Sequence, residues 1–304
     1  MIRNLFDFLV FPGFLTAIFV GLLTGGIDRV VTARIQWRKG PPLFQNFIDI
    51  IKLSAKEIII PAGARFTFLL SPFFGLLAVS LAAAIIGRAL INPLESFLGD
   101  VIVILYLLGI PAIALIIGAS SSRNPLASVG ASREMKLMLA YELPFIISLI
   151  TVIVKSKGAL HLGSIINYQV NNGANLYSFS GALAFICMLL CAHAKLGFVP
   201  FDVAEAEQEI MAGAMIEYSG LALALFKLTK AVLLYLLPLF LIGLFWFTNA
   251  NLFVFIGKFL VIIVLFVLIK NTNPRLRIDQ AIKFFWGPVT ICALAGLGLA
   301  ILGY

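Results

Sequence analysis

Eight long apolar runs constrain the fold of this chain more than any other feature of its sequence. A run of about 17–25 apolar residues is long enough to cross the hydrocarbon core of a bilayer as one helix. The predicted spans are residues 6–23, 69–86, 101–119, 137–154, 179–197, 219–237, 252–269 and 285–302, with an extension of the sixth past Pro238 to Phe247 left open. We therefore predict an all-α, polytopic integral membrane protein with about eight transmembrane helices, in which residues 1–304 form a single transmembrane domain.

Composition excludes the main soluble classes. Hydrophobic residues make up 62% of the chain and charged residues 12%, whereas about a quarter of a typical soluble domain is charged. The chain therefore has too few charges to cover a surface that faces water. The three cysteines lie inside apolar runs without a Cys-x-x-Cys pair, which excludes a disulfide framework and argues against iron–sulfur ligation.

The positions of the basic residues predict the orientation. Most of the 22 Lys and Arg residues lie on the odd-numbered connections, and the positive-inside rule assigns such loops to the cytoplasm. Both termini are then external, and the large cytoplasmic loops are about 25–66, 120–136, 198–218 and 270–284. The net charge of +8 then records topology and not a nucleic-acid partner. These loops carry both signs of charge, which suggests a docking surface for another protein.

The first cytoplasmic loop contains an amphipathic segment. Gln45, Asp49, Lys52 and Lys56 form a polar stripe at helical spacing, and apolar residues occupy another face. Such a helix could lie on lipid headgroups. The acids at Asp49 and Glu57 suit a partner protein slightly better than an anionic membrane surface.

Glu142 lies inside the fourth apolar run, two residues before Pro144. A carboxyl group at membrane depth costs about 2.5–3.5 kcal/mol on insertion scales, so it usually faces the bundle interior or a wet cavity. The alternative is a helix-end acid that reaches cytoplasmic water. Glu134 and Tyr141 nearby could extend a polar file.

The third cytoplasmic loop concentrates acidic residues at Asp202, Glu205, Glu207, Glu209 and Glu217. On a helix several of them would be i,i+3 or i,i+4 neighbours and would repel. Carboxylates held close cannot all ionise cheaply, so some would keep a proton near neutral pH, as a proton relay requires. A solvated acidic loop is the alternative. Candidate counter-charges are Arg133, Arg275, Arg277 and Asp279.

Neither histidine has partners at the spacing of metal ligands, so we predict no metal site. His193, inside the fifth span, could belong to a proton path with Lys195. The sequence contains no phosphate loop or nucleophile motif. The chain is thus expected to be a non-catalytic subunit without a cofactor of its own.

Several motifs identify a family resemblance. They are Ala33-Arg34-Ile35-Gln36-Trp37-Arg38-Lys39-Gly40-Pro41, residues 52–57, Pro200-Phe201-Asp202 through Glu209, Glu217-Tyr218-Ser219-Gly220 and Arg275-Leu276-Arg277-Ile278-Asp279. Over nearly its full length the chain resembles the NADH-dehydrogenase subunit 1 family, the membrane subunit at the junction of the redox arm and the ion-pumping arm of respiratory complex I. Eight transmembrane helices with an external N-terminus are what this family implies.

Within that family, the run Gly130-Ala131-Ser132-Arg133-Glu134-Met135 and the run 204–209 are similar to energy-converting group 4 nickel–iron hydrogenases and formate hydrogenlyases. One position departs from the family. Members commonly have an acid five residues before the proline of the Pro-Phe-Asp motif, whereas this chain has Lys195. His193 or Lys195 would have to replace that acid in the proton path.

The resemblance implies a membrane-anchoring and ion-coupling subunit of a cell-membrane hydrogenase that evolves H2 from reduced ferredoxin and translocates H⁺ or Na⁺. Its implied partners are hydrogenase large and small subunits with a nickel–iron centre, an iron–sulfur subunit, antiporter-like membrane subunits and membrane lipid. The quinone-site subunit of a complex I-type oxidoreductase is the alternative. A stand-alone transporter is disfavoured because no inverted repeat is visible.

Two sets of candidate residues follow. Ion coupling is expected to involve Glu142, Asp202, Glu205, Glu207, Glu209, Glu217, His193 and Lys195. Docking of the redox arm is expected to involve Asp28, Arg29, Arg34, Arg38, Asp49, Lys52, Lys56 and Glu57.

Overall fold

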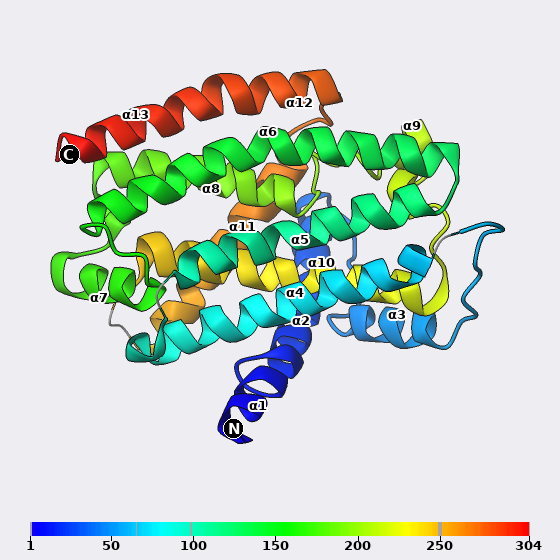
Figure 1. The fold of residues 1–304 in the computed structure, drawn as a ribbon, viewed down its shortest axis with the longest axis horizontal. Helices are drawn as coiled ribbons and strands as arrows, with labels where there is room; N and C mark the ends of the chain where they lie inside the picture. Colours follow the sequence, from blue (N-terminus) through cyan, green and yellow to red (C-terminus); the bar gives the residue numbers. More distant parts are fainter. Residues whose placement is uncertain (1, 65, 98, 249–250, 304) are drawn as a thin grey trace.

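A computed structural model describes residues 2–64, 66–97, 99–248 and 251–303 and, within them, all side chains except those of residues 2–5, 95, 207 and 208. The described chain is all-α (Figure 1). Seven helical segments in it are long and apolar enough to cross a membrane: Phe6–Ile35, Phe66–Ile91, Asp100–Ser121, Pro125–Lys155, Gly220–Trp246, Leu252–Thr272 and Ile278–Ile301. An eighth apolar helix, Phe179–Lys195, is shorter. The predicted class of polytopic all-α membrane protein is confirmed.

The helices in chain order are α1 (Ile2–Leu9), α2 (Phe14–Ile35), α3 (Gln45–Ser54), α4 (Phe66–Ile91), α5 (Asp100–Ser121), α6 (Pro125–Lys155), α7 (Leu162–Asn172), α8 (Phe179–Lys195), α9 (Glu207–Ile210), α10 (Gly220–Leu241), α11 (Leu252–Thr272), α12 (Ile278–Phe284) and α13 (Thr290–Ile301). Two π-helical turns interrupt the long helices, Ile242–Trp246 after α10 and Phe285–Val289 between α12 and α13. The sixth span therefore continues past Pro238, as its longer alternative required.

The start of α6 corrects one predicted loop. The loop expected over residues 120–136 is mostly helix, because α6 begins at Pro125. Proline suits the first helical position, and the Asn124 side chain accepts a hydrogen bond from the Leu126 backbone N–H at 2.9 Å. The opposite occurs in α8, which ends at Lys195 and not at the predicted Gly197. Gly197 has φ +61°, a left-handed conformation that terminates helices.

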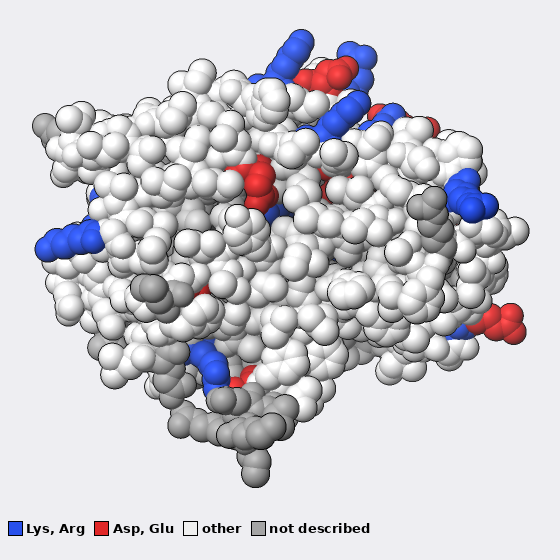
Figure 2. Space-filling model, in the orientation of Figure 1, with Lys and Arg blue, Asp and Glu red and all other residues white. Residues whose placement is uncertain are grey.

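Helix α10 is at the centre of the bundle. It contacts α2, α3, α4, α5, α8 and α11, and its span is the most buried of the seven. Helices α6 and α8 pack together, and α12 and α13 lie along them on the outside (Figure 1). The core consists mainly of apolar side chains, and the face in Figure 2 is largely uncharged. Such a surface suits contact with lipid or with apolar partner helices.

The two ends of the bundle differ. Helices α3 and α9 lie at one end, and α7 and the C-terminus lie at the other (Figure 1). The N-terminal segment joins the α7 end, because Arg88 in the last turn of α4 pairs with Asp7 at 2.5 Å. Both terminal segments therefore belong to the same end, which is the arrangement that the predicted external termini require.

Candidate coupling site at the loop end of the bundle

The buried acid of the fourth span has a cation for its partner. Glu142 in α6 and Lys195 at the end of α8 form an ion pair, with 2.8 Å between Nζ and Oε2. The Lys195 side chain is 2% exposed, and its Nζ also lies 4.7 Å from the centre of the Phe145 ring. A charged pair inside a bundle needs such direct contact to offset its desolvation. Lys195 thus neutralises Glu142, and the position that departs from the family contacts the acid predicted to be functional.

A small cavity lies next to this pair. It has a volume of about 50 Å³, and its charged lining residues are Glu134, Lys195, Asp202, Glu205 and Lys230. About 10–15 Å³ of such volume holds one water molecule, provided that polar partners are present. The cavity is therefore large and polar enough for a few water molecules.

The acids of the third cytoplasmic loop do not form a helical row. Only Glu207–Ile210 is helical, and residues before it run through turns and bends. Each acid with a described side chain has its own cation or donor: Asp202 pairs with Arg275 at 2.5 Å, Glu205 with Lys230 at 2.5 Å and Glu209 with Arg133 at 2.6 Å, while Glu217 accepts a hydrogen bond from Asn124. The expected repulsion between neighbouring carboxylates is replaced by these separate pairs. Glu207 lies outside the described side chains.

Close backbone packing holds this loop against α6. A Cβ atom at Gly130 would lie 2.4 Å from the backbone N of Ala214, so only glycine permits the approach. The Ala214 N–H donates to the Ala204 carbonyl at 3.3 Å across the loop. Burial raises the pKa of Asp202 above its ordinary value, and the neighbouring Glu205 adds to this effect, against the opposing charges of Lys230 and Arg275.

The predicted counter-charges divide into two groups. Arg133 and Arg275 pair with acids of the third loop, as expected from their charge. Arg277 and Asp279 make no ion pair among the described residues, and the Arg277 backbone N–H instead donates to the Gln280 side chain at the start of α12. The last cytoplasmic loop therefore reaches the acids through one arginine.

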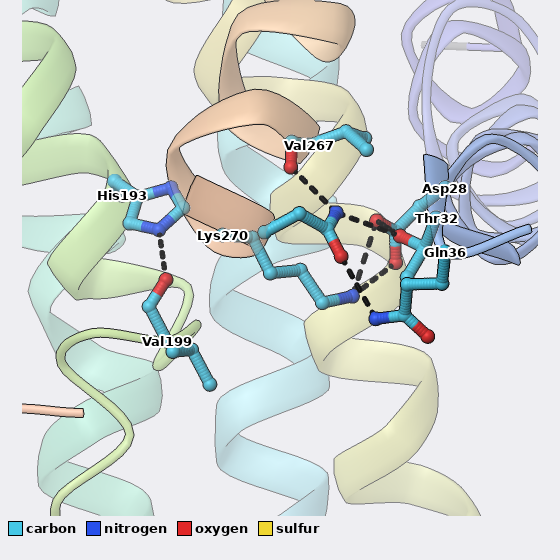
Figure 3. A network of polar contacts seen from close by, with 8 residues as sticks. Asp28, Thr32, Gln36, His193, Val199, Val267 and Lys270 are labelled. Atoms are coloured by element: carbon cyan, nitrogen blue, oxygen red, sulfur yellow. Dashed lines mark hydrogen bonds and ion pairs between the residues drawn. The ribbon is translucent and has the colours of Figure 1, made fainter. Parts of the chain in front are cut away.

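His193 lies apart from Lys195. It is fully buried, one ring nitrogen is 2.8 Å from the Val199 carbonyl oxygen, and its Nδ1 has no described hydrogen-bond partner. Figure 3 shows it beside Lys270 of α11, whose Nζ contacts Asp28 at 2.8 Å. Lys270 also lies 4.7 Å from the centre of the Phe198 ring. His193 thus belongs with the Asp28–Lys270 pair, and the expected path through His193 and Lys195 together has no contact among the described residues to support it.

The predicted docking residues also divide. Asp28 is 6% exposed and its carboxylate is bound by Lys270, so it is corrected to a residue that joins α2 to α11. Arg29 contacts Asp49 of α3 at 2.8 Å, and this guanidinium lowers the pKa of Asp49. Lys52, Lys56 and Glu57 are exposed. A hollow of about 470 Å³ is lined by Arg34, Trp37, Arg38 and Lys39, with Trp37 97% exposed.

The first and third cytoplasmic loops are joined directly. The Ile59 backbone N–H donates to Ser219 Oγ at 2.9 Å, and α3 contacts α10. Tyr218 stacks on Phe68 with 4.2 Å between ring centres. A displacement of the basic first loop would therefore reach the acidic loop through contacts of the backbone.

Three charged residues of the site are absent from the predicted site residues. On sequence alone Glu134 is only a neighbour of Glu142, and Lys230 and Lys270 are only loop charges. Lys230 lies inside the span of α10. The rule that singles out Glu142, an ionisable side chain within an apolar run, would also have found Lys230.

Comparisons with known proteins agree with this architecture. The family model described as NADH dehydrogenase matches residues 8–301. The chain is 32% identical to a membrane-complex component of Bacillus cytotoxicus, a subunit of NADH-quinone oxidoreductase, over 98% of this chain and 94% of the relative. The protein of the same description from Anoxybacillus flavithermus is 31% identical over 93% of this chain and 90% of its own length.

A solved structure is also similar. It is that of the membrane-bound sulfane sulfur reductase, described as an archaeal respiratory membrane complex. The matching chain superposes with a TM-score of 0.88 at 30% identity, and the match covers 98% of this chain and 99% of that one. The fold is therefore shared with subunits of more than one respiratory membrane complex.

Proposed function

The chain belongs to the NADH dehydrogenase subunit 1 family, as a multi-pass membrane subunit of a complex I-related respiratory complex, and from this premise we propose that it couples redox chemistry in attached subunits to ion movement. In this role the chain carries no redox centre. It anchors the redox arm through its first cytoplasmic loop and passes conformational change to the charged residues of the bundle.

The observation that carries the proposal is the series of ion pairs around the polar cavity. Asp202–Arg275 and Glu205–Lys230 lie at the loop, and Lys195–Glu142 lies inside the bundle. Lys195, Lys230, Asp202 and Glu205 line the same cavity. Ionisable residues inside a membrane bundle are costly and are typical of ion and proton pathways. Paired groups around water can exchange partners while little charge is exposed to lipid.

The finer proposal is the energy-converting hydrogenase branch. The run from Gly130 to Met135 resembles that branch, and it supplies two residues of the site, Arg133 and Glu134. On this proposal the soluble partners hold the nickel–iron centre and the iron–sulfur clusters, reduced ferredoxin is the electron donor and protons are the acceptor. Antiporter-like membrane subunits then move H⁺ or Na⁺.

The quinone-site subunit remains a second candidate because of a specific observation. A cavity of about 270 Å³ lies between α2, α3 and α10, beneath the first loop, and is lined by Leu22, Asp28, Ile50, Phe198 and Lys227 among others. The relatives from Bacillus cytotoxicus and Anoxybacillus flavithermus are described as quinone oxidoreductase subunits. An apolar cavity with a few polar groups is typical of a small-molecule site.

The intact purified complex distinguishes the two candidates. Nickel without bound quinone, together with H2 evolution from reduced ferredoxin, supports the hydrogenase branch. Bound quinone or reduction of a quinone analogue supports the second candidate. Reduction of a sulfane sulfur compound without either activity would reject both acceptors.

Coupling is tested in proteoliposomes that contain the intact complex. Glu142→Gln and Glu217→Gln keep side-chain shape but remove a titratable proton. We expect ion movement to fall at least as far as redox turnover, because the path carries the coupling. Asp7→Asn, an acid paired with an arginine at the opposite end, serves as the control. Unchanged turnover and an unchanged ratio of ions to electrons in both variants would reject the coupling role.

A further inference from the structure

Glu134 differs from the other acids around the cavity. It projects from α6, is 8% exposed, and lines the cavity with Lys195, Lys230, Asp202 and Glu205. No hydrogen bond or ion pair joins its carboxyl group to any other described residue. Polar groups buried to this degree normally have a partner, so the cavity itself must supply one.

The cations that face Glu134 are already bound. Lys195 of α8 contacts Glu142, and Lys230 of α10 contacts Glu205. The loop contributes two more acids to the same cavity, Asp202 and Glu205, and Asp202 is bound by Arg275. An ionised carboxylate at Glu134 would therefore face further negative groups while each cation of the cavity is engaged elsewhere. Burial of an unpaired charge is strongly unfavourable, so in this arrangement Glu134 is the neutral acid.

We propose that Glu134 is a proton-binding switch that holds a proton while Lys230 pairs with Glu205 and releases it when Lys230 turns to Glu134. This inference rests on the proposed coupling function and names the group that responds first. The carboxyl O–H bond breaks, the proton passes to water in the cavity, and the resulting carboxylate pairs with the Lys230 ammonium, which keeps its protons. No oxidant or reductant takes part in the step.

The surroundings of Glu205 make its pair with Lys230 the one that opens. Lys230 belongs to the central helix α10, whereas Glu205 belongs to the loop. That loop has two consecutive non-glycine residues with positive φ, Met211 at +50° and Ala212 at +70°. Such conformations are unfavourable for L-residues, and they persist only where the surroundings impose them. The loop also receives the bond from Ile59, so displacement of the first cytoplasmic loop acts on it.

Infrared difference spectroscopy of the intact complex tests the switch. The carbonyl-stretch band of a protonated carboxyl should be lost when the redox arm is reduced, and Glu134→Gln should lack this change. Asp100→Asn is the matched control, because Asp100 is also a fully buried acid with an unpartnered oxygen among the described residues, at the other end of the bundle. The control should keep the redox-linked band. Retention of the band in Glu134→Gln would overturn the assignment.

Lys230→Gln gives a second measurement that does not alter Glu134. Without the ammonium group, the carboxyl should stay protonated, so its band should persist in both redox states. Loss of the band on reduction in this variant would contradict the proposed partner exchange.

The ion-to-electron ratio separates this inference from the coupling function itself. We expect Glu134→Gln to lose coupled ion movement, as Glu142→Gln does. If Glu142→Gln uncouples the complex and Glu134→Gln does not, the switch is wrong and the coupling function stands. If neither changes the ratio, both fail.

Discussion

At the residue scale, the contact between Glu142 and Lys195 is the least expected result. The position that normally carries an acid in the family carries a cation, and the cation binds an acid of another helix at 2.8 Å. Either charge alone would be costly inside the bundle, whereas the two together largely cancel. The lysine thus preserves charge balance and still leaves a titratable group beside the cavity.

Removal of one partner should therefore destabilise the bundle more than removal of both. Glu142→Gln leaves the Lys195 ammonium unpaired, and Lys195→Met leaves the carboxylate unpaired, at a cost of about 3 kcal/mol for a buried pair. The double variant should recover most of this loss. The measurement is the thermal unfolding midpoint of the purified complex in detergent. A double variant that is no more stable than either single variant would contradict a paired interior.

At the element scale, the loop between α8 and α10 depends on one close approach. A Cβ atom at Gly130 of α6 would lie 2.4 Å from Ala214 N and 3.0 Å from Ala204 O. Because backbone atoms cannot rotate away, Gly130→Ala should displace the loop and break the pairs that Glu205 and Glu209 make. Hydrogen exchange over residues 204–214 should become faster.

The control for this prediction is Gly298→Ala in α13. No heavy atom lies within 4 Å of a Cβ at Gly298. Alanine is favoured over glycine in a helix by about 1 kcal/mol, so this variant should be as stable as the parent or slightly more. Equal exchange rates in the two variants would show that the loop does not rest on Gly130.

At the scale of the whole molecule, the exposed basic residues of the first loop are available for a partner. Arg34 and Arg38 line an open hollow at the end of α2. The double charge reversal Arg34→Glu with Arg38→Glu should release the soluble subunits from the membrane at moderate salt, because ionic contacts are screened there. Co-purification of the soluble subunits measures this. Lys157→Glu, an exposed reversal near the α7 end, should leave the complex intact, and an intact complex in both cases would reject the docking assignment.

The bundle was largely predictable from the sequence, and the site only partly. Glu142 and the acids of the third loop stood out because ionisable residues are rare near apolar runs. Asp28 was misassigned to a docking surface, because its cation comes from Lys270, far along the chain. Glu134 and Lys230 carried the same kind of signal in weaker form, close to the ends of apolar runs, where topology alone could explain them.

By itself, the sequence determined the fold class, the number of apolar helices to within the short α8, and the residues with unusual charge. These properties follow from local composition, because each apolar run must satisfy its backbone hydrogen bonds within its own helix. Only the tertiary structure decided which charges meet. Asp202 pairs with Arg275, Glu205 with Lys230 and Glu142 with Lys195. Each pair joins separate elements, and its formation depends on how the helices pack, which no local pattern specifies.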